Sequence, residues 1–466
     1  MKLENIKEII TESRRVFFVG IGGVSMASLA RYLKAEGKEV FGSDRAESDN
    51  VRSLRLEGIR VFPGHNANNV DGADALVFTG AVDDSNPEIK KAKEMGIPVI
   101  SRAALLGALM LDSPVCIGIA GTHGKSTTTA MLADILLAAG NDPTIMCGAS
   151  LPSINGAYRR GSGAFLFEAC EYKDSFLSFR PSIAAILNVD YDHTDYFPSI
   201  ESVISSFGKY AAIPGEKGHV ITCADDENAL KAAGNALTFG FSPSADYRCE
   251  SLSENGGFYS FTVLNRGEKT DVTLGVPGRH NVMNALAAFA CADVAGIEKR
   301  TIAEALSSFS GLSRRFERRG SVGGADVYID YAHHPREIRA AIDAARKMTS
   351  GRIITVFEPH TFSRTRSLYD DFTNAFENAD VKIFTDVFAA RESDTLGVSS
   401  KMLARDAGGV YAESYSVAAS MIQKLAQDGD TVLILGAGTI FKVADIIGER
   451  YAHTENTDGR DQRRNV

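Results

Sequence analysis

Short apolar runs alternate with amphipathic stretches along the chain, a pattern typical of a parallel sheet covered by helices. In the first part, apolar residues 16–19, 75–78 and 97–100 predict strands, with helical stretches between them. A further strand is expected to end at Asp44. We therefore expect residues 1–111 to form one small α/β domain with a Rossmann-like arrangement.

The alternation continues through a central segment. Mostly apolar runs at 117–120, at 164–168, which ends in an acid, and at 183–189 predict buried strands there. Residues 245–274 instead alternate in short stretches broken by Gly and Asn, which indicates antiparallel strands. We expect residues 112–313 to form a second α/β domain with a mostly parallel sheet.

The last segment returns to the alternation of strand and helix. Residues 326–330, 353–357 and 431–435 predict strands. The periodicity thus predicts a third, Rossmann-like α/β domain over 314–466. Its tail after about residue 453 is polar and charged, and we expect it to be disordered.

The stretch that follows the strand at 117–120 has the clearest chemistry. It reads Gly121-Thr122-His123-Gly124-Lys125-Ser126-Thr127 and opens a helix. Such a loop can wrap its backbone N–H groups around a polyphosphate, while the helix N-terminus supplies positive potential. Lys125 would reach the terminal phosphates, and Ser126 would offer its hydroxyl to Mg²⁺. Ile119 stands where the strict pattern has a glycine, but a plain strand-to-helix turn would not explain Gly-Lys-Ser after an apolar strand.

A second glycine loop follows the first strand of the chain. It contains Gly22, Gly23 and Ser25, and Asp44 ends the next strand about 20 residues further on. This layout is typical of a dinucleotide or nucleotide-sugar fold, although Ser25 occupies the place of the third glycine. A ligand-free turn and a nicotinamide dehydrogenase remain alternatives. A dehydrogenase would not account for the Lys125 loop.

Acidic side chains and one histidine follow the predicted strands of the central segment. Glu168 ends a strand whose edge should lie near the phosphate loop, so its carboxylate could hold Mg²⁺. An ordinary solvated strand end is the alternative. His193 lies between Asp192 and Asp195, where it could bind a second metal ion or orient a phosphate group. The two acids could equally be turn and helix-cap residues.

Two carboxamides, Asn281 and Asn284, are three residues apart on a predicted helix and share a face. Carboxamides can both donate to and accept from an adenine ring. Capping of the helix by Asn281 explains the same residues without a ligand.

The last segment contains two candidate pairs. His333 and His334 could be metal ligands, but no Cys or Glu lies at zinc-like spacing from them. Arg364 and Arg366 are expected in a loop after a strand. They are either exposed surface arginines or guanidinium forks that match a carboxylate or phosphate.

Composition narrows the function classes. The 466 residues are 44% hydrophobic and 23% charged, which is ordinary for a globular enzyme. The net charge of −9 argues against nonspecific nucleic-acid binding. No apolar run is long enough to span a bilayer, the N-terminus lacks an apolar signal core, and the six cysteines are scattered without a Cys-x-x-Cys pair. We therefore expect a cytoplasmic protein with reduced thiols and with neither nucleic-acid nor membrane partners.

Several motifs stand in one order along the chain. They are Gly121–Ser126, Glu168-Ala169-Cys170-Glu171, Asp192-His193-Thr194-Asp195, His280-Asn281 with Asn284, Gly311–Glu317 and Asp330–Pro335. In this order and spacing the chain resembles the Mur ligase family, the ATP-dependent amide ligases of bacterial peptidoglycan synthesis. The resemblance covers nearly the whole chain. Together with the motifs at 20–23, 331–335 and 358–366, it implies UDP-N-acetylmuramate and L-alanine as substrates, joined through an acyl phosphate.

The resemblance also implies a division of labour. The first domain would bind the UDP-sugar, the second, a P-loop ATPase domain, would bind ATP, and the third would bind the amino acid and close over the site. For the phosphates, the resemblance implies Lys125 and Arg315, with Arg314 as a further candidate, and for two Mg²⁺ ions it implies Ser126, Glu168 and His193. For the nucleotide it implies Asn281, Asn284 and Asp330. For the amino-acid and phosphate side it implies His333, Arg364 and Arg366, and for the sugar nucleotide the Gly22 loop with Asp44.

The chain departs from the family pattern at a few positions. Ser25 replaces a glycine, Ser126 replaces the usual threonine, and Ile329 stands where a second acid usually precedes Tyr331. A sister ligase acting on a recycled peptide or on another amino acid remains an alternative. So does a nucleotide-dependent regulatory protein with a degenerate site, although the intact Lys125 loop argues against it.

Overall fold

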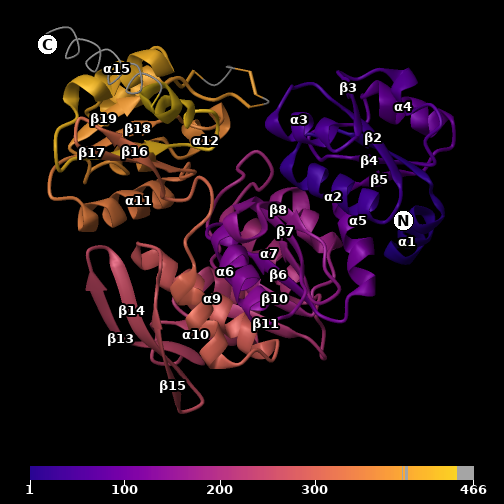
Figure 1. Ribbon diagram of the computed structural model, residues 1–466, viewed down its shortest axis with the longest axis horizontal. Helices are drawn as coiled ribbons and strands as arrows, with labels where there is room; N and C mark the ends of the chain where they lie inside the picture. Colours follow the sequence, from indigo (N-terminus) through magenta and orange to yellow (C-terminus); the bar gives the residue numbers. More distant parts are fainter. Residues whose placement is uncertain (391, 394–396, 449–466) are drawn as a thin grey trace, which may run out of the picture.

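The computed structural model describes residues 1–390, 392–393 and 397–448, and these form three α/β domains. The N-terminal and C-terminal domains both adjoin the central one (Figure 1). Helix α2 (Val24–Ala35) of the N-terminal domain packs near strand β7 (Thr144–Leu151) of the central domain. Helix α11 (Pro335–Met348) of the C-terminal domain packs near α9 (Arg279–Val294) of the central domain. The predicted three-domain α/β fold with mostly parallel sheets is therefore confirmed.

The N-terminal domain is built on a parallel five-stranded sheet in the order β3-β2-β1-β4-β5. Strand β1 is buried on both faces, because helices cover both sides of the sheet. The strands are β1 (Arg15–Val19), β2 (Glu39–Asp44), β3 (Arg60–Pro63), β4 (Ala75–Phe78) and β5 (Val99–Ser101). The helices are α1 (Leu3–Glu12), α2 (Val24–Ala35), α3 (Asp49–Leu56), α4 (Pro87–Glu94) and α5 (Arg102–Leu109).

The central domain contains a sheet of ten strands, counted over the described residues, in the order β15-β14-β13-β12-β11-β10-β6-β9-β7-β8. Its strands are β6 (Cys116–Ala120), β7 (Thr144–Leu151), β8 (Gly156–Arg159), β9 (Phe165–Glu168), β10 (Ile183–Ile186), β11 (His219–Cys223), β12 (Leu237–Gly240), β13 (Tyr247–Asn255), β14 (Phe258–Asn265) and β15 (Glu268–Thr273). Its helices are α6 (Lys125–Ala138), α7 (Ile200–Ala211), α8 (Glu227–Ala233), α9 (Arg279–Val294) and α10 (Lys299–Ser308). The antiparallel pairing predicted within 245–274 is confirmed by β13, β14 and β15, and β13 joins them to the parallel strand β12.

The C-terminal domain contains a six-stranded sheet within the described part of the chain, in the order β16-β17-β21-β18-β19-β20. The strands are β16 (Glu317–Val322), β17 (Ala325–Asp330), β18 (Ile353–Phe357), β19 (Val381–Phe384), β20 (Val410–Tyr411) and β21 (Thr431–Leu435). The helices are α11 (Pro335–Met348), α12 (Phe362–Ser367), α13 (Tyr369–Asn374), α14 (Ser400–Asp406) and α15 (Tyr415–Leu425). The tail predicted to be disordered after about residue 453 lies outside the described residues.

One prediction about the C-terminal domain is wrong. Arg364 and Arg366 were expected in a loop, but they lie in the short helix α12. The side chain of Thr361 caps this helix by accepting a hydrogen bond from the backbone N–H of Arg364 at 3.4 Å. A six-residue helix is too short to show a helical period in the sequence, so only the capping threonine indicates it.

The sheet order brings the central motifs to one edge. Strand β6 pairs in parallel with β9 on one side and with β10 on the other. Ligands in open α/β sheets collect at the carboxyl ends of such strands. The phosphate loop after β6, Glu168 at the end of β9 and the segment after β10 therefore meet. Among the described residues, no helix has the length and apolar character needed to cross a membrane.

Candidate active site

The phosphate loop between β6 and α6 depends on its glycines. Gly124 has a φ of 83°, and a Cβ there would lie 2.4 Å from Oδ1 of Asn284. Gly121 has a φ of 142°, and a Cβ would lie 2.9 Å from the side chain of Leu187. Any larger residue would therefore combine left-handed backbone strain with a steric clash. The glycines let the loop lie close to both β10 and α9.

Lys125, the first residue of α6, is engaged by a carboxylate. Its Nζ lies 3.0 and 3.2 Å from the two oxygens of Glu171, and it also donates to the carbonyls of Gly121 and Thr122. Burial alone would lower the pKa of Lys125, but the nearby negative charge of Glu171 outweighs it and raises that pKa. Lys125 is therefore a fixed positive charge at the base of the loop.

Glu171 was not among the residues selected from the sequence. Its side chain is only 2% exposed, and one oxygen lies 3.7 Å from Nε2 of His193. His193 has a φ of 52°, and its ring lies 4.8 Å from the ring of Tyr172. The only sequence signal for Glu171 was the second acid in Glu-Ala-Cys-Glu. The structure thus joins Lys125 and His193 through Glu171.

The other predicted metal ligands lie on the same edge of the sheet. Glu168 ends β9, and one of its oxygens accepts the backbone N–H of Gly148 at 2.9 Å. Ser126 is buried in the first turn of α6. Along this edge the candidate donors are one hydroxyl, two carboxylates and one imidazole, and one of the carboxylates, that of Glu171, is paired with Lys125. This oxygen-rich set fits a hard cation such as Mg²⁺.

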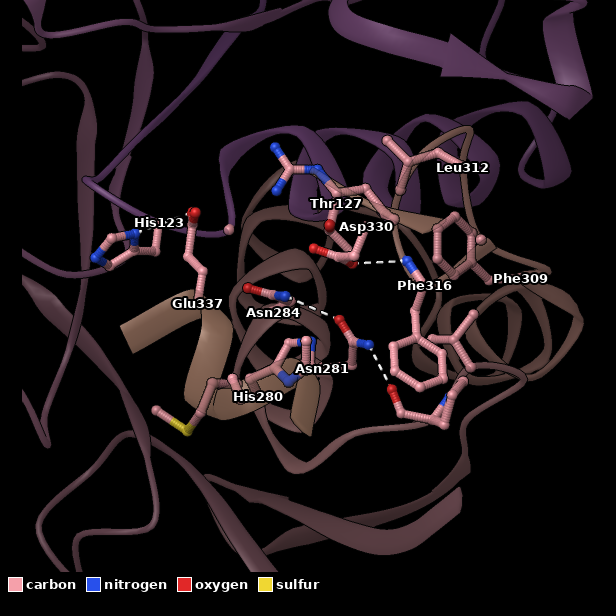
Figure 2. A pocket seen from close by; sticks show the side chains of 18 of the residues that line it. His123, Thr127, His280, Asn281, Asn284, Phe309, Leu312, Phe316, Asp330 and Glu337 are labelled. Carbon is pink, nitrogen blue, oxygen red and sulfur yellow. Dashed lines mark hydrogen bonds and ion pairs between the residues drawn. The ribbon is translucent and has the colours of Figure 1, made fainter. Parts of the chain in front are cut away.

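A cavity of about 710 Å³ opens beside the loop, between the central and C-terminal domains (Figure 2). Residues that line it include His123, Gly124, Thr127, His280, Asn281, Asn284, Phe309, Arg315, Phe316, Asp330 and Glu337. Pockets of this size, with mostly apolar walls and a few polar groups, hold small ligands.

The two carboxamides lie in this cavity. Asn284 donates from Nδ2 to Oδ1 of Asn281 at 3.0 Å, and Asn281 donates to the carbonyl of Pro277 at 2.6 Å (Figure 2). Gly278 is the N-cap of α9, so the alternative in which Asn281 caps the helix is wrong. Both side chains are held in place by neighbours and present a polar edge to the cavity.

Arg315 and Asp330 border the cavity from the C-terminal domain. The two oxygens of Asp330 accept backbone N–H groups of Phe316 and Ala332, each at 2.7 Å. Burial raises the pKa of Asp330 to about 6, although Arg315 acts in the opposite direction. Arg314 instead donates to the carbonyls at 436 and 438, at 3.0 and 2.9 Å. Of the two arginines, only Arg315 lines the cavity.

Arg364 joins the C-terminal domain to the central one. Its guanidinium binds the carboxylate of Asp192 through two contacts, of 2.9 and 3.2 Å, with side-chain exposures of 9% and 8%. Burial acts to raise the pKa of Asp192, but Arg364 overrides it and holds that pKa well below its usual range. Arg366 is exposed on the same helix. The two arginines proposed as a pair thus have different surroundings.

His333 is placed beside this interface. Its Nδ1 lies 3.0 Å from the carbonyl of Tyr331 and 3.3 Å from Glu337. Burial lowers the pKa of His333 to about 3, so the ring is neutral at physiological pH.

The N-terminal loop is also preorganised. Asp44 accepts the backbone N–H of Gly22 at 2.8 Å, so this acid already holds the loop. A Cβ on Gly22 would lie 2.9 Å from the same oxygen, which explains the glycine. Gly23 is exposed on the loop. Arg102 donates to the hydroxyl of Ser25 at 2.9 Å, a contact that no sequence motif indicated.

Comparisons with known proteins cover most of the chain. Three family models match: "Mur ligase family, catalytic domain" over residues 15–113, "Mur ligase middle domain" over 119–292 and "Mur ligase, glutamate ligase domain" over 314–438. The chain belongs to the Mur ligase family. The three matched segments follow the order of the three sheets.

Among curated relatives of this Mur ligase, the UDP-N-acetylmuramate–L-alanine ligase of Caldicellulosiruptor saccharolyticus is 43% identical over 445 residues. That match covers 93% of this chain and 98% of the relative. The ligase of the same name from Acetivibrio thermocellus is 42% identical and covers 93% and 95%.

Solved structures agree. The UDP-N-acetylmuramate-alanine ligase of Thermotoga maritima superposes with a TM-score of 0.81 at 29% identity, over 94% of this chain and 99% of that one. A murein peptide ligase from Psychrobacter arcticus has a TM-score of 0.73 at 25% identity, over 94% and 98%. The Mur ligase fold predicted from the motif order is therefore confirmed over the whole length that these relatives share.

Proposed function

We propose that this Mur ligase uses ATP to join L-alanine to the carboxylate of UDP-N-acetylmuramate, a step in the synthesis of peptidoglycan precursors. One observation carries the proposal: Lys125, Glu171 and His193 meet at the carboxyl end of the central sheet, beside a cavity closed by the C-terminal domain. The curated relatives with that name, at 42–43% identity over 93% of the chain, support the choice of substrates.

The chemistry requires two steps on the substrate carboxylate. The carboxylate first attacks the γ-phosphorus of ATP and forms an acyl phosphate, with ADP as the leaving group. The amine of the amino acid then attacks the acyl carbon, and phosphate leaves from the tetrahedral intermediate. Neither step needs a nucleophilic side chain, so the protein has to position the reactants and stabilise developing charge.

The roles of individual residues follow from their places. Lys125 would offset negative charge on the transferred phosphoryl group, and Arg315 would do so from the cavity that it lines. Asn281 and Asn284 would contact the adenine edge, with Asp330 on the nucleotide. The backbone N–H groups from Gly121 to Thr127 would surround the phosphates.

Magnesium is the cation that these donors would hold, with Ser126 and Glu168 on one ion, His193 on a second, and Glu171 as a further carboxylate. When bound, it would neutralise charge on the phosphoryl oxygens. The oxygen-rich chemistry of the donors supports this assignment.

The substrates at the two ends would be held by the flanking domains. The Gly22 loop, with Gly23, Ser25 and Asp44, would take the sugar nucleotide. His333, Arg364 and Arg366 would lie on the amino-acid side. We propose domain limits of 1–111, 112–313 and 314–466, which agree in order with the three family models.

The test is phosphate release from ATP with a panel of amino acids. We expect release only when UDP-N-acetylmuramate and an amino acid are both present, with L-alanine preferred over glycine and L-serine. Equal release without the sugar nucleotide would refute the substrate assignment.

The likeness to a murein peptide ligase supports one alternative, a sister enzyme that attaches a recycled peptide. An L-alanyl tripeptide in the same panel separates the two functions. Faster release with the tripeptide than with L-alanine would favour the sister reaction.

A further inference from the structure

His123, in the middle of the phosphate loop, is held from both sides by carboxylates. Its Nε2 lies 3.3 Å from Oδ2 of Asp190, which follows β10 in the central domain. Its Nδ1 lies 3.1 Å from Oε1 of Glu337, which belongs to α11 of the C-terminal domain. Figure 2 shows Glu337 beside His123 at the edge of the cavity. A carboxylate only accepts hydrogen bonds, so this geometry requires a proton on each ring nitrogen.

The histidine is therefore an imidazolium in this arrangement. Burial would lower the pKa of His123, but its hydrogen bonds to Asp190 and Glu337 raise it to about 9. The ring of His123 thus stays charged at neutral pH. It bridges Asp190 of the central domain and Glu337 of the C-terminal domain.

Other charged groups face this cluster. Arg336 donates to Oδ2 of Asp190 at 2.9 Å from the C-terminal side. The ring of His334 lies 4.7 Å from that of His123, and burial lowers the pKa of His334. The pKa of Glu337 lies well below its usual range, because the positive charges of His123 and Arg315 and the hydrogen bond to His123 outweigh the effect of burial. Of the histidines and carboxylates in this cluster, His123 alone changes charge in the mildly alkaline range.

Glu337 links the ring to the start of α11. Its other oxygen, Oε2, accepts the backbone N–H groups of His333 and His334 at 3.1 and 3.3 Å. This is a capping box, which fixes the first turn of the helix. The carboxylate therefore couples the position of the phosphate loop to the orientation of α11.

We propose that His123, Asp190 and Glu337 form a clasp that docks the C-terminal domain directly on the phosphate loop, with Glu337 as the positioning residue. The clasp couples the conformation of the phosphate loop to the closure of the C-terminal domain. The inference deepens the proposed function, because closure of this domain would exclude water from the acyl phosphate. Docking of the C-terminal domain can be measured without turnover. A negative result for the clasp would therefore leave the ligase assignment unaffected.

The test uses Glu337→Gln in the full chain. Glutamine can keep its oxygen on the two backbone N–H groups and turn its NH₂ toward His123, so the helix cap survives while the ring loses one carboxylate. Docking is followed by energy transfer between labels at exposed positions of the central and C-terminal domains. In the wild type we expect docking to weaken as pH rises, with a midpoint near the His123 pKa of about 9. In Glu337→Gln we expect the midpoint to fall by at least one pH unit.

A matched control comes from a second contact between the same regions. Glu254 on β13 lies 3.9 Å from Lys347 on α11, and both side chains are substantially exposed, at 32% and 56%. Glu254→Gln makes the same chemical change at a screened surface pair and should leave the midpoint unchanged. An equal shift in both variants would overturn the proposal, because it would show a general charge effect.

A second variant guards against a folding defect. Asp190→Asn removes the carboxylate on the other side of the ring and should also lower the midpoint. The ATP dependence of turnover then distinguishes a role of Glu337 in domain closure from a role in ATP binding. A clasp predicts that Glu337→Gln lowers kcat by about tenfold or more at saturating ATP, since fewer molecules are closed. An unchanged docking midpoint in both Glu337→Gln and Asp190→Asn would refute the clasp.

Discussion

The buried pair between Arg364 and Asp192 allows a quantitative prediction about domain docking. Both side chains are almost inaccessible to solvent, and the pair joins two residues that are 172 positions apart in the chain. Asp192→Asn replaces one carboxylate oxygen by an NH₂ group that faces a guanidinium N–H. The arginine then remains buried without its counter-charge while the domains stay closed.

The magnitude follows from the cost of breaking such pairs. Removing one partner of a buried ion pair costs about 3–5 kcal/mol, because an uncompensated charge remains in a region of low dielectric. Here the charge regains water as soon as the domains separate, so the cost falls on the closing equilibrium rather than on folding of either domain. Since a factor of ten corresponds to about 1.4 kcal/mol, closure should weaken roughly a hundredfold to a few thousandfold.

The assay is small-angle X-ray scattering of the full chain, which reports the radius of gyration as the domains separate. We expect Asp192→Asn to expand while its circular dichroism stays that of the wild type. The matched control is Arg346→Met, which breaks the pair between Arg346 and Asp380. That pair is exposed and lies within the C-terminal domain, so closure should not change. A wild-type radius of gyration for Asp192→Asn would refute the reasoning.

Three further predictions concern the cavity and its loop. Lys125→Met should abolish ligation and also lower the melting temperature, because Glu171 stays buried without its partner; adding Glu171→Gln should recover stability but not activity. Gly124→Ala should lose nucleotide binding in calorimetry, since its Cβ would lie 2.4 Å from Asn284. The pKa of Asp330 is raised to about 6, so this group favours folding below its unfolded pKa, near 4, and the benefit is lost as pH rises through 6. In urea titrations, Asp330→Asn should therefore gain up to about 3 kcal/mol relative to the wild type between pH 4 and pH 7; a constant difference would contradict the raised pKa.

Features of the fold that depend on local sequence were predictable. Strand β1 is an apolar run that is buried on both sides of the sheet. The glycine loop after β6 predicts the helix that follows it. Strand β3 and helix α3 were not predicted. Only one of the four residues of β3 is buried, and α3 buries only Val51 and Leu54, so each offers too few apolar positions to define a hydrophobic period over its length.

The contacts of the site were less predictable than its residues. The sequence indicated Lys125, His193 and Asp44 from their places next to strands and glycines. It did not indicate that Glu171 pairs with Lys125, or that Asp44 holds the backbone of Gly22. Such partners are chosen by tertiary packing, and several acids at similar spacing compete for each cation or N–H group. Selecting among them requires the sheet order.

The pair between Lys125 and Glu171 has a consequence for selectivity among anions. With the carboxylate in place, the positive charge of the loop is already neutralised, so a small anion must displace Glu171 before it can bind. Inorganic phosphate carries less charge than a triphosphate and would make few further contacts, so it would displace Glu171 poorly. A triphosphate brings more charge and also occupies the cavity beside Asn281 and Asn284. The loop should therefore discriminate against the phosphate that the reaction releases, and product inhibition by phosphate should be weak.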